Sequence, residues 1–155
     1  TLDTADVMKM IQSVQQQLVP SAPQQPQGSI QVDSGESYYV DNVNSGHLFI
    51  IKGHAINKYS APRSELKVIA TLYKDKGIPL LKRSVYCGNI ITDNELKNIQ
   101  LDEIIKRTDN PFGTALSNVS IAPGQSLPFM VVFNEIPENL SEFSVEAESS
   151  KPASK

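Results

Sequence analysis

The sequence predicts a mainly β domain: a two-layer antiparallel β-sandwich of about seven strands, with one short helical insertion after the fourth strand. Three observations favour this fold. Short segments rich in Val, Ile, Tyr and Phe recur through the middle of the chain, most of them are separated by turns that contain Gly, Pro, Asn or Asp, and 155 residues is the usual length of one domain. The pattern alone leaves a small barrel and an α+β arrangement open as alternatives.

The first four strands are expected before residue 87. Residues 38–43 form a short first strand, and residues 46–57 form a longer one that contains a purely apolar run. Residues 66–73 alternate between apolar and polar side chains, which is the period of a strand. A glycine-containing turn at residues 75–77 leads into residues 79–86, so this pair of strands should form a β-hairpin.

After the fourth strand the apolar spacing becomes helical. One or two short helices are expected within residues 92–108, where Thr92 or Asp93 is available to cap the first turn. Strand patterns then resume, and three further strands are predicted at residues 115–121, 127–133 and 142–148.

The two flanks differ from this β-rich centre at residues 37–148. Residues 1–18 place apolar side chains at helical spacing and predict an amphipathic helix or stalk. Residues 19–36 are rich in Pro and Gln and predict a linker, and residues 149–155 predict a disordered tail. The chain begins at Thr1 without an initiator Met or a signal-peptide pattern, so we expect it to be a segment of a longer protein.

Composition argues against several classes of protein. The chain has 14 Lys and Arg against 17 Asp and Glu, a formal net charge of -3, whereas a nucleic-acid-binding domain would normally present a basic face. One Cys excludes an internal disulfide, and one Cys with two His is too few for a closed structural zinc site. No apolar run is long enough to form a membrane-spanning helix.

No set of residues predicts catalysis. Cys87 lies at a predicted strand end without a protease or thioredoxin motif around it, and the sequence G-x-S-x-G of α/β-hydrolases is absent. His47 and His54 are seven residues apart on one predicted strand, which makes them poor joint metal ligands. A glycine-rich phosphate-binding loop is absent as well. We therefore expect no catalytic residue, no cofactor and no metal, and a hydrolase would require Cys87 beside one of the histidines.

The centre of the chain contains an ordered set of short motifs: Gly53-His54-Ala55-Ile56-Asn57, Pro62-Arg63-Ser64, Ala70-Thr71-Leu72-Tyr73-Lys74-Asp75, Lys76-Gly77, Val85-Tyr86-Cys87-Gly88-Asn89, Asn94-Glu95-Leu96, Pro123-Gly124 and Leu127-Pro128-Phe129-Met130-Val131-Val132-Phe133. This ordered set resembles a bacterial family of uncharacterised domains, over residues 45–147. Members of that family are usually carried at the C-terminal end of membrane proteins that begin with a zinc-ribbon-like finger and cross the membrane once. The hairpin is also similar to the wider FxLYD type of β-sandwich, although Lys74 separates Tyr73 from Asp75 and the insertion at residues 92–108 is extra.

The resemblance implies an immunoglobulin-like or fibronectin-like sandwich on the extracytoplasmic side of the bacterial inner membrane, tethered by a helix outside this sequence. The leading hypothesis is then a non-enzymatic interaction domain whose partner is another protein or an envelope component. The alternative is a domain that binds a small ligand or an envelope polymer, with the helical insertion closing one end of the sandwich over a pocket. Loops on a rigid scaffold commonly carry binding, so the predicted interaction surface comprises Arg63, Tyr86, Asn89 and Asn94.

Overall fold

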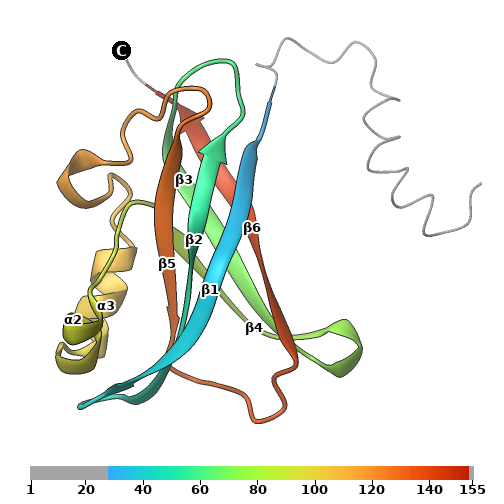
Figure 1. Ribbon diagram of the computed structural model, residues 1–155, viewed down its shortest axis with the longest axis vertical. Coiled ribbons are helices and arrows are strands. Elements are labelled where there is room, and N and C mark those ends of the chain that lie inside the picture. Colours follow the sequence, from blue (N-terminus) through green and yellow to red (C-terminus); the bar gives the residue numbers. More distant parts are fainter. Residues whose placement is uncertain (1–27, 154–155) are drawn as a thin grey trace, which may run out of the picture.

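The computed structural model describes residues 28–153, and this part of the chain is mainly β (Figure 1). Its two three-stranded antiparallel sheets have the strand orders β1-β2-β5 and β4-β3-β6. Two helices lie between β4 and β5 in the sequence. The elements are β1 (Ile30–Asn42), β2 (Gly46–Asn57), β3 (Arg63–Lys74), β4 (Ile78–Tyr86), α2 (Asp93–Asn98), α3 (Leu101–Thr108), β5 (Ser126–Phe133) and β6 (Glu142–Pro152).

The two sheets enclose the main hydrophobic core. Phe49 and Ile51 of β2 face it from the first sheet, and Leu66 and Val68 of β3 face it from the second. All four side chains are almost completely shielded from solvent. Burying such inner rows contributes about 25 cal/mol per Å² of apolar area, which is the main stabilising contribution that two facing sheets provide.

The helical insertion packs on the outer face of the β1-β2-β5 sheet, beside β5 in Figure 1. Leu96 of α2 and Ile104 of α3 are buried there against Leu48 and Ile50 of β2. Neighbouring residues of β2 are therefore buried on opposite faces of the sheet, which explains why the sequence has an uninterrupted apolar run at this point. The insertion thus covers a face of the sheet, whereas the ligand-binding hypothesis expected it to close one end of the sandwich.

Six strands are present among the described residues, and the strand predicted at residues 115–121 is wrong. That segment contains a short 3-10 turn, Thr114–Leu116, and joins a sheet only through an isolated bridge between Ile121 and Arg63. The backbone of Ala115 and Leu116 is left-handed, with φ of 57° and 63°, which is incompatible with a strand.

Both long edge strands extend into segments that had been assigned to the flanks. β1 begins at Ile30, so residues 30–36 of the predicted linker pair with the second half of β2. β6 continues to Pro152 and includes residues 149–152 of the predicted tail. The exposed face of an edge strand is free to be polar, so these segments lack the apolar content on which strand prediction depends. The predicted helix at residues 1–18 lies outside the described residues.

The start of α2 offers a test of how the insertion is held. Thr92 and Glu95 form a capping box: the Thr92 hydroxyl accepts from the Glu95 N–H at 3.2 Å, and Glu95 Oε1 accepts from the Thr92 N–H at 3.4 Å. We expect Thr92→Ala to destabilise the insertion by about 1 kcal/mol, because the Glu95 N–H in the first turn loses its acceptor. Hydrogen exchange of the α2 amides should then be roughly fivefold faster. Thr92→Ser keeps the hydroxyl and should exchange like the parent; equal rates in all three proteins would contradict the prediction.

Candidate functional site

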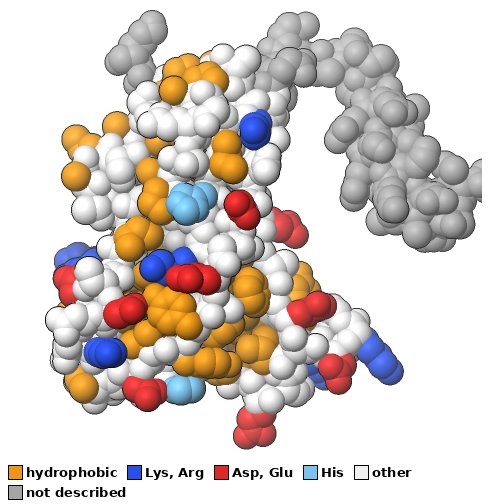
Figure 2. All heavy atoms as spheres, viewed as in Figure 1, with side chains coloured by type: hydrophobic (Ala, Val, Ile, Leu, Met, Phe, Trp, Pro, Cys, Tyr) orange, Lys and Arg blue, Asp and Glu red, His pale blue; other side chains and the backbone are white. Residues whose placement is uncertain are grey.

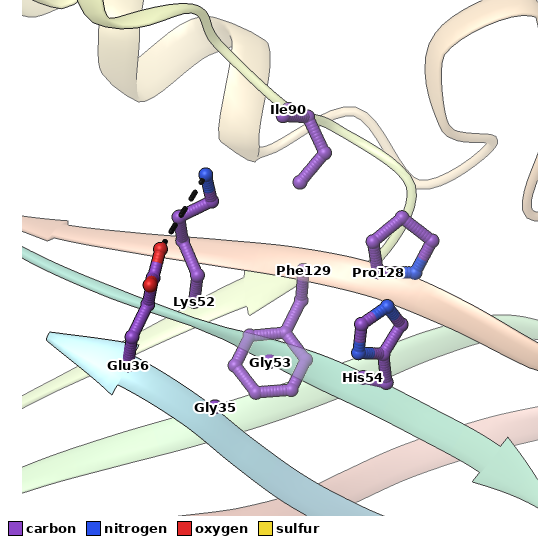
Figure 3. A pocket seen from close by; sticks show the side chains of 8 residues that line it. All are labelled: Gly35, Glu36, Lys52, Gly53, His54, Ile90, Pro128 and Phe129. Carbon is purple, nitrogen blue, oxygen red and sulfur yellow. Dashed lines mark ion pairs between the residues drawn. The ribbon is translucent and has the colours of Figure 1, made fainter.

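A hollow of about 520 Å³ lies on the outer face of the β1-β2-β5 sheet, where the cover of α2 and α3 ends (Figure 3). Its floor includes Gly53 of β2 and Phe129 of β5. Figure 3 shows Ile90, from the segment that leads into α2, across from the strands. The polar side chains of its lining are Glu36, Lys52 and His54. The hollow therefore combines mainly apolar atoms, among them those of Ile90 and Pro128, with a cation, a carboxylate and an imidazole.

The alternation of β2 places two of these polar residues in the hollow. Leu48, Ile50, Lys52 and His54 share the outward face of the strand because they are two residues apart. The first pair lies beneath the insertion and is buried, whereas the second pair lies beyond it and lines the hollow. The polar side chains thus begin where the helical cover ends.

The charged side chains of the hollow interact only weakly with each other. Lys52 Nζ lies 4.0 Å from Glu36 Oε2, and both side chains are at least a third exposed. Lys52 Nζ also lies 5.8 Å from the centre of the Tyr38 ring. A solvent-exposed ion pair of this kind contributes about 0–1 kcal/mol, so either charge is available to a bound partner.

Tyr38 connects the sheet to the insertion next to this hollow. Its hydroxyl donates to Asp93 Oδ1 at 2.9 Å. Burial, and then the hydrogen bond and negative charge of Asp93, raise the pKa of Tyr38 to about 12. The phenol therefore stays protonated well into the alkaline range and remains a donor that holds α2 against β1.

A smaller hollow of about 300 Å³ lies at the insertion itself and contains an ion-pair network. The Arg107 guanidinium donates to Glu95 at 3.0 Å and to Glu103 at 3.2 Å. The hydrogen bond from Arg107, followed by that from the Thr92 N–H, lowers the pKa of Glu95. Because these groups already satisfy one another, we assign this network to holding α2 and α3 together rather than to binding a ligand.

The four residues predicted as an interaction surface have different environments. Arg63 is buried, donates to Ser150 Oγ at 3.0 Å and to the Ser150 carbonyl at 3.1 Å, and stacks on Tyr59. Asn89 is also buried and donates to the Asn110 carbonyl at 2.9 Å.

The other two residues are more accessible. Tyr86 is half-buried at the end of β4, and Asn94 is exposed in the first turn of α2. The structure brings Asn89 close to the backbone of Tyr86, whereas Arg63 makes its contacts with β6. Glu36, Lys52 and Pro128, which line the large hollow, were not singled out from the sequence. The available signal was the change from apolar to polar side chains along β2.

Cys87 is buried in the core between the sheets, away from the two histidines that a hydrolase would need. His54 lines the hollow on the outer face of the sheet, and His47 pairs with Asp41 and stacks on Tyr39. Burial raises the pKa of Cys87 to about 12, so almost no thiolate exists at neutral pH.

The raised pKa of this thiol predicts a specific dependence of stability on pH. The thiol ionises near its ordinary pKa of 9.0 in the unfolded chain and only at about 12 in the folded chain. The contribution of the protonated thiol to the free energy of unfolding is therefore complete below pH 9 and is lost as the pH rises toward 12. Above pH 9 the free energy of unfolding should fall by about 1.4 kcal/mol per pH unit more in the parent than in Cys87→Ala. Urea unfolding of both proteins at several pH values measures the difference. Parallel pH profiles would contradict it.

Two findings concern other possible sites. Within residues 28–153, no three or more His, Cys, Asp or Glu side chains cluster in a way that could hold a metal ion. The helices of the described part of the chain are too short and too polar to cross a membrane.

The fold and the hollow define a class of protein: a two-sheet antiparallel β domain whose helical insertion covers part of one outer face and leaves an open, mainly apolar hollow beside it. The chain belongs to the family described as "Protein of unknown function (DUF3426)", whose model matches residues 11–147. No curated protein matches the chain, and no solved structure matches it.

Proposed function

We propose that this domain is a non-enzymatic interaction module, with an immunoglobulin-like or fibronectin-like sandwich as its scaffold, that binds another protein or an envelope component. The observation that carries this proposal is the hollow beside Ile90. It is open to solvent, its lining is mainly apolar, and its charged groups are only loosely paired. Such a surface suits an extended segment of a partner, because apolar contacts supply affinity while Lys52 and Glu36 select its polar groups.

We further propose that the domain acts on the extracytoplasmic side of a bacterial inner membrane, tethered by a helix outside the present sequence. This part rests on the resemblance of residues 45–147 to domains carried by single-pass membrane proteins. Fusion of alkaline phosphatase or of green fluorescent protein to the C-terminus of the full gene product tests it. Phosphatase activity without fluorescence is the expected result, and the reverse would place the domain in the cytoplasm.

Site-specific photocrosslinking tests the binding surface in the source cells. A photoreactive phenylalanine analogue at Ile90 should give a discrete adduct of higher mass, because this side chain is 40 % exposed at the hollow. The matched control is Ile78, which is 46 % exposed at the start of β4. Lys52→Glu should weaken the adduct at position 90, since it replaces the lysine cation of the hollow with a second carboxylate beside Glu36. Adducts of equal intensity at both positions, or none at either, would contradict the proposal.

The volume of the hollow also supports a second candidate function, the binding of a small ligand or of a segment of an envelope polymer. A volume of about 520 Å³ lies within the range of small-molecule sites, roughly 300–1,000 Å³. A ligand that binds only the folded state raises the unfolding temperature with its concentration. A thermal shift with soluble envelope-glycan fragments that disappears in Ile90→Asp would favour this candidate over a protein partner.

A further inference from the structure

A second surface of the domain has an unusual composition. Residues 110–134 contain no Asp, Glu, Lys or Arg, in a chain in which 20 % of the residues are charged. Part of this stretch is the buried strand β5, where the absence of charge is ordinary. The remainder, residues 110–125, is a loop that is largely exposed, and there the absence of both signs of charge calls for another explanation.

The loop also exposes apolar side chains. Phe112, Leu116 and Val119 are 48 %, 65 % and 37 % exposed. None of them lines the hollows described above. In Figure 2, hydrophobic and uncharged side chains occupy the upper left of the molecule, where Figure 1 shows the loop between α3 and β5.

The backbone that presents Leu116 is strained and yet held in place. A left-handed conformation costs a residue other than Gly roughly 1–2 kcal/mol, and both Ala115 and Leu116 adopt it. The loop is closed by a hydrogen bond from the Asn118 N–H to the Phe112 carbonyl at 2.7 Å, and the Ser117 hydroxyl donates to the Gly88 carbonyl at 3.2 Å. The fold therefore fixes an exposed leucine instead of letting the loop turn it inward.

This loop adjoins the end of the domain at which the chain enters and leaves. The Ser29 carbonyl accepts from the Lys58 N–H at 2.8 Å, which places the first described residues against the β2–β3 loop. At the start of that same loop, Asn57 Nδ2 donates to the carbonyl of Ile121, a residue of the uncharged segment, at 2.8 Å. The Ala153 N–H donates to Pro62 nearby, at 3.1 Å.

We infer that the loop from Phe112 to Val119 docks on a phospholipid bilayer, with Phe112, Leu116 and Val119 entering the boundary between headgroups and acyl chains. A bilayer needs no complementary pocket and excludes charges of either sign, which fits apolar side chains on a convex, uncharged loop. A protein interface would more commonly combine aromatic residues with Arg and a polar, charged rim.

Three apolar side chains give weak and reversible binding, comparable at most to a single acyl chain. The inference therefore rests on the membrane tether included in the proposed function, which makes weak docking intramolecular. A chemical tether can replace the natural one in vitro. Failure of the docking can then be distinguished from failure of the proposed location, which the reporter fusions measure in cells.

The experiment uses the absence of Trp from the chain. Phe112→Trp introduces a single fluorophore into the protein, which is attached through an N-terminal histidine tag to phosphatidylcholine vesicles containing a nickel-chelating lipid. We expect its emission to move to shorter wavelength and to be quenched by brominated acyl chains. Val43→Trp, an exposed position in the β1–β2 turn, should keep the emission of a solvated indole.

Leu116→Asn in the Phe112→Trp protein separates apolar contact from folding, because Asn tolerates the left-handed conformation better than Leu. This variant should remain folded by circular dichroism and lose most of the shift and quenching. Three outcomes would overturn the inference: no shift on tethered vesicles, an equal shift at position 43, or a shift that grows with protein concentration in the absence of vesicles. The last outcome would identify a second copy of the chain as the occupant.

Discussion

Gly53→Ala is expected to lower the free energy of unfolding by about 3 kcal/mol, at the upper end of the usual effect of overpacking. A Cβ at this position would lie 2.3 Å from the Asp33 carbonyl oxygen, 2.8 Å from the Ser34 Cα and 2.7 Å from the Phe129 ring. Two of these atoms belong to the backbone of β1 and cannot rotate away. Relief therefore requires β1 to move away from β2 and the Phe129 ring to shift from its buried position.

Gly35→Ala is the matched control for this substitution. Gly35 lies opposite, at the bulge where the register of β1 and β2 shifts, and its Cβ would meet only the Lys52 carbonyl oxygen at 3.4 Å. Its substitution should cost well under about 1 kcal/mol, since a contact at that distance needs only slight adjustment. Urea unfolding of the two variants and the parent measures both effects. Equal losses would mean that the close approach of β1 to Gly53 is not what fixes the floor of the hollow.

Much of the fold was predictable because several strands carry local signals. The alternation in β3, the glycine turn and the returning strand β4 predicted a hairpin, and the structure confirms it through the antiparallel pairing of Val68 with Val85. The apolar run at Leu48 predicted a strand as well. Its cause became visible only with the insertion in place, since burial on both faces depends on Leu96 and Ile104, far away in the sequence.

The incorrect strand at residues 115–121 shows the limit of local patterns. Alternating apolar residues are typical of a strand, but whether a segment joins a sheet depends on whether the neighbouring strand has unpaired backbone groups. The Leu66 N–H of β3 donates to the side chain of Asn118 instead of to the backbone of a neighbouring strand, and the same side chain donates back to the Leu66 carbonyl. The periodicity of apolar residues cannot show that a side chain takes the place of a strand in this way.

The candidate site was less predictable than the fold. Sequence reasoning favoured polar loop residues, and two of them, Arg63 and Asn89, are buried and bonded within the domain. The hollow consists instead of strand residues that became accessible because α2 and α3 cover only part of the sheet. Its position follows from the length and placement of the insertion, which tertiary packing determines.

Asn118→Ala provides the second large expected effect, because one side chain replaces a strand partner. Asn118 is completely buried; its Nδ2 donates to the Leu66 carbonyl at 3.0 Å, and its Oδ1 accepts from the Leu66 N–H at 2.9 Å. Removing the amide leaves the buried Leu66 N–H without a partner, at a cost of about 1–3 kcal/mol, whereas the Leu66 carbonyl keeps a hydrogen bond from the Cys87 N–H at 2.9 Å. We expect a loss of about 2 kcal/mol in the free energy of unfolding, measured by urea denaturation.

The exposed Asn139 in the loop before β6 provides the control, since Asn139→Ala removes the same group where water replaces its hydrogen bonds. It should change stability by less than about 0.5 kcal/mol. Hydrogen exchange locates the effect. In Asn118→Ala the amide of Leu66 should exchange much faster, whereas the exchange rate of the Val131 amide in β5 should change only as much as the global stability does. If Asn118→Ala matched Asn139→Ala instead, the amide would not be the group that completes the edge of β3, and the absence of a strand at residues 115–121 would need a different cause.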